Sequence, residues 1–135
     1  MARNFTTKVN KEKKTFSTGA QREVKPGKGR YDLISPLALK RVADIYERGA
    51  GHYGDRNWEQ GIPLSSFVDS GLRHLYQFIE GKTDEDHAAA CLWNIIGLVH
   101  TEEMIYRGLL PIELNDLPCY TPKDYEDGEK KNGEG

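Results

Sequence analysis

The sequence has few cysteines, no long apolar run and no segment typical of a secretory signal. Its 135 residues include no stretch near the roughly 18 apolar residues that a transmembrane helix requires. The N-terminal segment MARNFTTKVNKEKKTF has no apolar centre like that of a signal peptide. The two cysteines, Cys91 and Cys119, have no paired spacing that would predict zinc binding. We therefore expect a cytoplasmic protein without a disulfide bond and without a membrane partner.

Several catalytic signatures are also absent. The sequence contains neither a GxxxxGK[ST] loop nor a His-Glu-x-x-His motif. Asp86-His87 has the reverse order of the His-Asp pair of HD-type phosphohydrolases, which argues against that class. The net charge of −2 gives no overall attraction to nucleic acid or to an anionic membrane. Function must therefore be inferred from local groups of side chains.

The chain length predicts one domain with one core. We expect a flexible basic arm over residues 1–16, a folded domain over 17–115 and a flexible polar tail over 116–135. The arm carries five basic residues before position 15 against the single acid Glu12. A nucleic-acid contact through this arm is one alternative, and a solvated arm is the other.

Helical periodicity and capping residues organise the centre of the chain. Ser35 is a suitable N-cap, and Pro36 suits the first helical position. Gly49, Gly81 and Gly108 provide places for helices to end. We expect helices over 36–49, 65–80 and 84–107, and an ordered loop over 50–63.

The predicted fold is all-α, because no segment between 36 and 110 alternates with period two. The short linker after the second helix predicts an antiparallel αα-hairpin, which places Glu80 beside the acids that start the third helix. The third helix is apolar nearly all round from Ala88 to Val99, more than a small chain covers alone. We therefore expect a bundle of about three main helices completed as a homodimer or homotetramer.

Charged and imidazole side chains are concentrated within this apolar region. Uncompensated charge costs several kcal/mol in a helical core, so such groups persist only if paired, hydrogen-bonded or bound to a cation. A metal-dependent site is the leading hypothesis, with a solvated Asp69–Arg73 pair and dipole-stabilised acids at the third helix as the alternatives. The residues concerned are Asp69, Arg73, His74, Glu80, Asp84, Glu85, Asp86, His87 and Asn94.

Two further features suit a phosphate ligand. Asp44 and Glu47 share a face of the first predicted helix, and carboxylates from three helices suit Mg²⁺ or Mn²⁺. Zinc is less favoured because no closely spaced His/Cys pair occurs. Glycines beside Lys28 and Arg30 predict an anion-binding loop, and an exposed linker is the alternative interpretation.

Three stretches of the sequence together resemble a known family: GAQREVKPGKGRYDLISPLAL, YERGAGHYGDRNWEQGIPLSSFVDSGLRHL and EGKTDEDHAAACLWNIIGL. The combination is similar to the phage dATP/dGTP diphosphohydrolases, related to the all-α MazG-like nucleotide pyrophosphohydrolases. The resemblance covers about residues 19–104. It implies metal-dependent hydrolysis of purine deoxynucleoside triphosphates to the monophosphate and pyrophosphate, in nucleotide-pool control in the host cytoplasm.

The same resemblance suggests roles for individual residues. Glu47, Asp69, Glu80 and Asp86 would hold Mg²⁺ or Mn²⁺, and His74 or His87 would move a proton. The substrate-binding set would comprise Lys28, Arg30, Tyr31, Tyr53, Asn57, Trp58, Arg73 and Asn94. The sequence departs from the MazG-like Glu-x-x-Asp pattern at Thr83, three residues after Glu80. The alternative function is therefore a non-catalytic helical adaptor or a DNA- or protein-binding phage protein.

Overall fold

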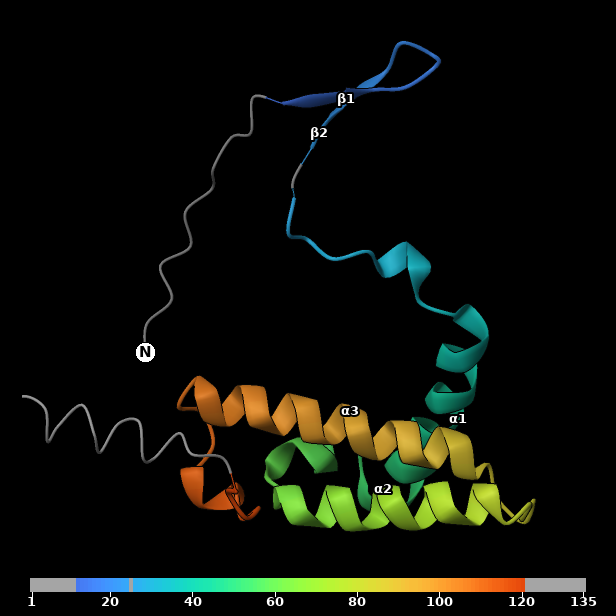
Figure 1. The fold of residues 1–135 in the computed structure, drawn as a ribbon, viewed down its shortest axis with the longest axis vertical. Helices are drawn as coiled ribbons and strands as arrows, with labels where there is room; N and C mark the ends of the chain where they lie inside the picture. The colour runs from blue at the N-terminus through green and yellow to red at the C-terminus, as the bar shows by residue number, and fades with distance from the viewer. Residues whose placement is uncertain (1–11, 25, 121–135) are drawn as a thin grey trace, which may run out of the picture.

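The computed structural model describes residues 12–24 and 26–120 (Figure 1). Within these ranges the fold is mostly helical, as predicted, with three α-helices and a small hairpin. The α-helices are α1 (Pro36–Tyr53), α2 (Leu64–Ile79) and α3 (His87–Tyr106), and the 3-10 helices are η1 (Tyr31–Leu33), η2 (Asn57–Gln60) and η3 (Ile112–Leu114). Most of the predicted arm and tail, residues 1–11 and 121–135, lies outside the described residues. None of the described helices is long and apolar enough to cross a membrane.

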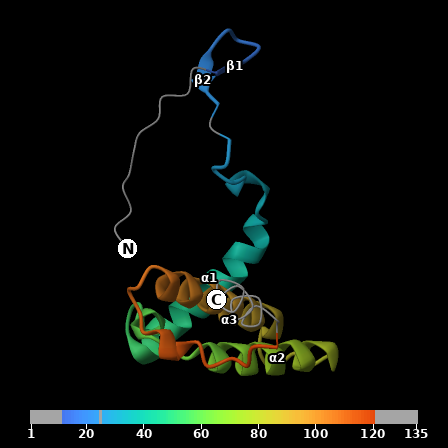
Figure 2. The ribbon, with the colours of Figure 1, turned by 60° about the vertical axis from the view of Figure 1, so that its left-hand side comes forward.

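The hairpin is not anticipated by the sequence pattern. Strands β1 (Lys13–Thr15) and β2 (Gln21–Glu23) pair antiparallel, with Lys14 opposite Arg22. Gly19, at φ 85°, supplies the left-handed residue of the turn. Three-residue strands are too short to show period-two alternation, which explains the missed prediction. Figures 1 and 2 both show the hairpin projecting away from the helices.

Helix α1 begins where predicted and ends later. The Ser35 Oγ accepts a hydrogen bond from the backbone N–H of Ala38 at 3.2 Å, and Pro36 follows at the first helical position. The predicted end at residue 49 is wrong. The helix continues to Tyr53 and stops at Gly54, whose φ of 86° strongly favours glycine. The additional turn carries α1 into the candidate site.

Helices α2 and α3 form the predicted antiparallel hairpin, seen side by side in Figure 1. Small residues allow the two backbones to approach closely. A Cβ atom added to Gly71 would lie 3.4 Å from the Cβ of Asn94. The contact residues are spaced by four and three on α2 and by seven and three on α3, which keeps them on one face of each helix. The contacting pairs are Phe67 with Gly97, Gly71 with Asn94, and His74 with His87.

The start of α2 is capped by a residue distant in sequence. Pro63 occupies the N-cap position and offers no side-chain hydrogen bond. Asp116 instead accepts a hydrogen bond from the backbone N–H of Ser65 at 2.9 Å, and a second from the Ser65 hydroxyl. These bonds lower the pKa of Asp116 below its ordinary value. The segment after η3 is thereby attached to the helical hairpin.

Helix α3 starts at His87, so the predicted start at residue 84 is wrong. Asp86 is the N-cap, and its carboxylate accepts from the backbone N–H of Ala89 at 3.2 Å. The two oxygens of the same carboxylate also accept hydrogen bonds from Nε and Nη2 of Arg41. The hydrogen bond from Arg41 is the largest influence that lowers the pKa of Asp86 to about 2. Asp86 therefore joins α1 to the start of α3.

The core is small and aromatic. Val42, Leu64, Phe67 and Ala89 are its most buried apolar side chains. An aromatic cluster, made of Tyr46, Trp58, Phe67, Trp93 and His100, joins α1, η2, α2 and α3 through ring contacts of 4.8 to 6.0 Å between centroids. This cluster fixes α1 and η2 against the helical hairpin, next to the cavity described below.

Candidate metal centre

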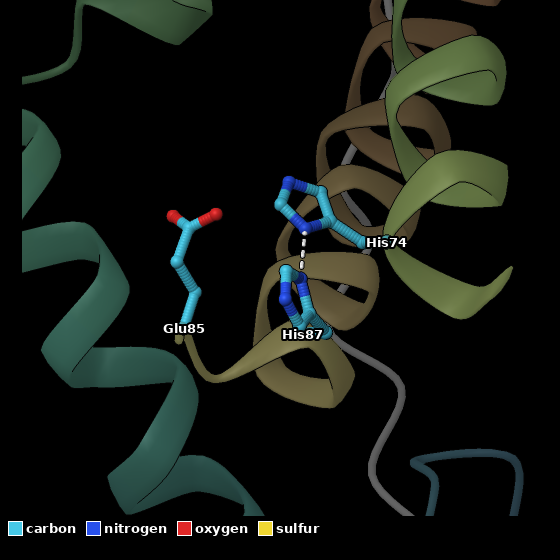
Figure 3. A group of neighbouring side chains, drawn as sticks. All are labelled: His74, Glu85 and His87. Atoms are coloured by element: carbon cyan, nitrogen blue, oxygen red, sulfur yellow. Dashed lines mark hydrogen bonds between the residues drawn. The ribbon is translucent and has the colours of Figure 1, made fainter. Parts of the chain in front are cut away.

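Two histidines and one glutamate converge at the closed end of the α2–α3 hairpin (Figure 3). His74 comes from α2, Glu85 from the connecting loop and His87 from the first turn of α3. One ligand atom from each residue lies within 4.8 Å of the other two. Within residues 12–24 and 26–120, no other group of three or more His, Cys, Asp or Glu side chains meets this geometry.

A chain of hydrogen bonds selects the tautomer of neutral His87. The His87 side chain is fully enclosed, and its Nε2 lies 2.8 Å from Oδ1 of Asp84. A carboxylate accepts hydrogen bonds, so Nε2 of His87 carries the proton and donates it. In neutral His87 the Nδ1 lone pair then faces Nδ1 of His74, 2.9 Å away. Without a metal ion, Nδ1–H of His74 donates to that lone pair.

This arrangement fits a divalent metal ion. Metal-binding histidines almost always donate the second ring N–H to a carboxylate or carbonyl, as His87 does to Asp84. Two metal–nitrogen bonds of about 2.1 Å place their nitrogens roughly 3.0–3.4 Å apart, so the two imidazoles need to separate only slightly. The Glu85 carboxylate has no hydrogen bond or ion pair among the described residues. Three protein ligands with open positions are typical of a catalytic centre.

The local sequence explains why these three side chains meet. His74 lies three residues after Gly71 on the face of α2 that packs against α3. Gly81, at φ 80°, lets the chain turn directly after α2. Asp86 then ends the loop by capping α3, which leaves Glu85 outside the helix and beside the two imidazoles. The triad thus depends on the turn between the helices.

A cavity of about 820 Å³ opens beside the triad. Its walls are the C-terminal half of α1, η2 with the residues before it, and the facing sides of α2 and α3. His74 and Glu85 contribute to the lining, and so do Arg48, Tyr53, Trp93 and Asn94. This volume is in the range of pockets that hold small-molecule ligands.

The aromatic side chains around the cavity differ in how tightly they are packed and how exposed they are. Trp58 is held edge-on against Tyr46 and His100, with ring centroids 5.7 and 4.8 Å away. Tyr53 lies at the rim and is 75% exposed. Asn94 is 5% exposed, and its Nδ2 donates to the carbonyl oxygen of Ala90 at 2.8 Å. Tyr53 is therefore the aromatic residue most accessible to a ligand.

The structure brings together only some of the residues predicted for the centre. His74 and His87, predicted to move protons, are both in the triad. The four predicted metal ligands form no such group among the described residues. Three of them have cationic partners: Asp69 pairs with Arg73 at 3.1 Å, Glu80 pairs with Lys82 at 3.2 Å, and Asp86 pairs with Arg41. The fourth, Glu47, is exposed on α1. Asp69 and Glu80 are exposed on the side of α2 away from Gly71, which prevents their convergence.

The predicted substrate-binding residues divide in the same way. Those that line the cavity are Tyr53, Asn57, Trp58 and Asn94. Those outside its lining are Lys28, Arg30, Tyr31 and Arg73. Arg30 forms a bidentate pair with Asp32 in the segment before α1, at 2.8 Å for each bond. The anion-binding loop predicted there thus lies apart from the triad in this chain, as Figure 1 shows.

The sequence placed Asp84 and Glu85 in the polar cluster of the predicted metal site, but neither was assigned as a ligand, and Arg48 was not singled out. Acids in the first turn of a helix are explained by the helix dipole, which hid the roles of Asp84 and Glu85. The three-residue spacing of Asp84 and His87 could have indicated their pairing, because it brings both side chains to one side of the helix start.

One comparison with known proteins gives a match. The family model described as dATP/dGTP diphosphohydrolase, N-terminal, matches residues 18–107, which include all three α-helices and the triad. No curated protein and no solved structure matches the chain.

Proposed function

Because the chain belongs to the dATP/dGTP diphosphohydrolase N-terminal family, we propose that it hydrolyses dATP or dGTP to the monophosphate and pyrophosphate with a divalent metal ion. The metal ligands in this proposal are His74, Glu85 and His87. The observation that carries the proposal is the hydrogen bond from Nε2 of His87 to Asp84. This bond leaves the Nδ1 lone pair of His87 facing His74, beside the unpaired carboxylate of Glu85.

The metal ion would lower the pKa of a bound water and polarise a phosphate oxygen. Asp84 keeps His87 in the tautomer whose Nδ1 binds a cation. Water oxygen attacks the α-phosphorus, the bond to the bridging oxygen breaks, and pyrophosphate leaves with the electron pair while the water proton passes to solvent. In this proposal Tyr53, exposed at the rim, would stack on a purine. As metal ligands, His74 and His87 would hold the cation rather than carry the proton.

The donor set favours one of the two predicted cations. Magnesium prefers oxygen ligands, whereas imidazole nitrogens suit transition metals. Two imidazoles and one carboxylate therefore favour Mn²⁺ over Mg²⁺ within the predicted pair. Zinc, which the sequence spacing disfavoured, also suits this donor set, because the histidines meet across two helices rather than along one.

Two matched variants test this proposal. Glu85→Gln removes a triad carboxylate, and Glu80→Gln removes a carboxylate that pairs with Lys82 outside the triad. Purified proteins are freed of metal, reloaded with Mn²⁺ and assayed for release of dAMP, dGMP and pyrophosphate. We expect at least a hundredfold loss of activity for Glu85→Gln, at about 2.7 kcal/mol per hundredfold, and near wild-type activity for Glu80→Gln. The opposite ranking would support the ligands chosen from sequence, and a wild type without any turnover would favour the adaptor.

A second copy of the chain is the proposed partner. Six large apolar side chains, which we call the outer face, are at least 42% exposed on α2 and α3: Leu72, Leu75, Tyr76, Ile79, Ile95 and Val99. Helical spacing places them on the side of the hairpin away from the cavity. Several large apolar side chains exposed on one side are typical of an interface, and pairing two outer faces would complete a helical bundle.

The oligomeric state tests this partner. We expect the wild type to sediment as a homodimer or homotetramer and Ile79→Glu to sediment as a monomer. Ile112→Glu is the matched control, because Ile112 is 72% exposed and lies outside the outer face. A monomeric wild type, or equal effects of both variants, would contradict the proposal.

A further inference from the structure

The cavity beside the triad contains an arginine side chain that forms no ion pair among the described residues. Arg48 lies on α1 and contributes to the same cavity wall as His74 and Glu85. Its side chain makes no hydrogen bond or ion pair among the described residues. Arg56, the other arginine of the lining, is paired with Glu59. Arg48 is therefore the lining arginine that is free to bind an anion.

The position of Arg48 directs its charge toward the metal centre. It follows Arg41 by seven residues, two helical turns, so both arginines lie on the same side of α1. Arg41 binds Asp86 directly through Nε and Nη2. Asp86 is the direct neighbour of both Glu85 and His87. Arg48 therefore lies on the side of α1 that faces the start of α3, and it lines the same cavity as His74 and Glu85.

The charge balance of the site shows why an additional cation is required. The two positive charges of a metal ion would be offset by the carboxylates of Glu85 and Asp84, and Asp55 adds negative charge to the cavity wall. A chain of phosphates bound at such a metal ion would meet a surface with no net positive charge. Arginine supplies this charge together with several donors arranged for phosphate oxygens.

From these observations we infer that Arg48 binds the phosphate chain of a metal-bound nucleoside triphosphate. This inference rests on the proposed function and extends it with a residue for the anionic part of the substrate. Tyr53 lies five residues further along α1, about 7.5 Å along the helix axis. The wall formed by α1 thus runs from a phosphate-binding end at Arg48 to a base-binding end at Tyr53.

Titrations with Mn²⁺ and with inorganic tripolyphosphate test the inference on the full chain. The variants are Arg48→Gln, Arg48→Lys and, as the control, Arg107→Gln, which removes an equal charge at the far end of α3 where Arg107 pairs with Glu103. We expect Mn²⁺ to bind all four proteins within about twofold. Tripolyphosphate should bind Arg48→Gln roughly 10- to 100-fold more weakly than wild type, and Arg48→Lys at an intermediate level. Higher salt should shrink the difference, because Arg48 is exposed.

The possible outcomes separate this inference from the proposed function. Equal tripolyphosphate affinities for wild type and Arg48→Gln would overturn the inference, as would a wild type that binds no tripolyphosphate. Loss of Mn²⁺ binding in Arg48→Gln would also overturn it, since Arg48 would then support the centre rather than the ligand. A wild type that binds no metal contradicts the proposed function alone. In that case, tripolyphosphate titrations of metal-free wild type and Arg48→Gln still test the inference. The charge of Arg48 must strengthen tripolyphosphate binding even without a metal ion.

Discussion

Replacing Gly97 by alanine tests whether close contact between α2 and α3 builds the metal centre. A Cβ atom at position 97 would lie 2.4 Å from Cε1 and 2.8 Å from Cζ of the Phe67 ring. Carbon atoms in favourable contact are about 3.5–4.0 Å apart, so the overlap exceeds 1 Å. Phe67 is 1% exposed and packs against Trp93 at a centroid distance of 6.0 Å, so the ring has little room to move. The remaining relief is separation of the two helices.

The stability cost of the clash can be estimated by comparing Gly97→Ala with Gly71→Ala. Gly71→Ala brings the same gain in helix propensity, about 1 kcal/mol, but its Cβ would lie 3.4 Å from the nearest atom, the Cβ of Asn94. The difference between the variants therefore isolates the clash. Overpacking of a tight core costs typically 1–3 kcal/mol, and the severity of this contact places Gly97→Ala near the upper end. We expect it to be less stable than Gly71→Ala by about 2–3 kcal/mol, on the order of 10 °C in melting temperature.

Urea unfolding followed by far-UV circular dichroism measures this difference. Separation of α2 from α3 would also move His74 away from His87, so Mn²⁺ affinity should fall in Gly97→Ala more than in Gly71→Ala. Phe67→Leu introduced into Gly97→Ala should cost less stability than Phe67→Leu alone, because the shorter side chain relieves the overlap. Equal stabilities of the two glycine variants would refute the proposed packing of the hairpin.

Three further predictions concern the site and its supports. Asp84→Ala should weaken Mn²⁺ binding about 10- to 100-fold, because it removes the hydrogen-bond acceptor of His87. Calorimetry can measure this loss, and unchanged affinity would remove Asp84 from the site. The pKa of Asp116 is lowered in the folded state, so its stabilising contribution is complete above pH 3.8 and is lost as pH falls through the lower, folded value. Asp116→Asn should therefore show a smaller acid-induced loss of stability in urea titrations from pH 6 to pH 3, and an identical loss would contradict this. Tyr53→Ala should raise KM for dATP while Tyr53→Phe leaves it nearly unchanged, since stacking needs the ring and not the hydroxyl.

The helices were predictable where the signal lies in neighbouring residues. Ser35 and Pro36 determine the start of α1 through local capping, and the sequence indicated it correctly. The end of α1 depended on which of several glycines adopts positive φ, and Gly54 does so. The cap of α2 could not be inferred, because Asp116 is far from Ser65 in the sequence.

The residues of the site were only partly predictable, for a related reason. His74 and His87 stand out as imidazoles in apolar helices, and the hairpin brings them together. Helical spacing shows which residues share a face but not what lies opposite that face. Asp86 was assigned to a metal ion because its partner Arg41, on another helix, is not visible in the sequence. Glu85 belonged to the predicted polar cluster but was not chosen as a ligand, because its position depends on the conformation of the turn.

Anomalous diffraction from crystals of the Mn²⁺-loaded protein would locate the metal ion. We expect one strong manganese peak per chain, bonded to a ring nitrogen of His74, a ring nitrogen of His87 and a carboxylate oxygen of Glu85. Asp84 should remain hydrogen-bonded to Nε2 of His87. A peak among Glu47, Asp69 and Glu80, or no peak at the triad, would contradict the account.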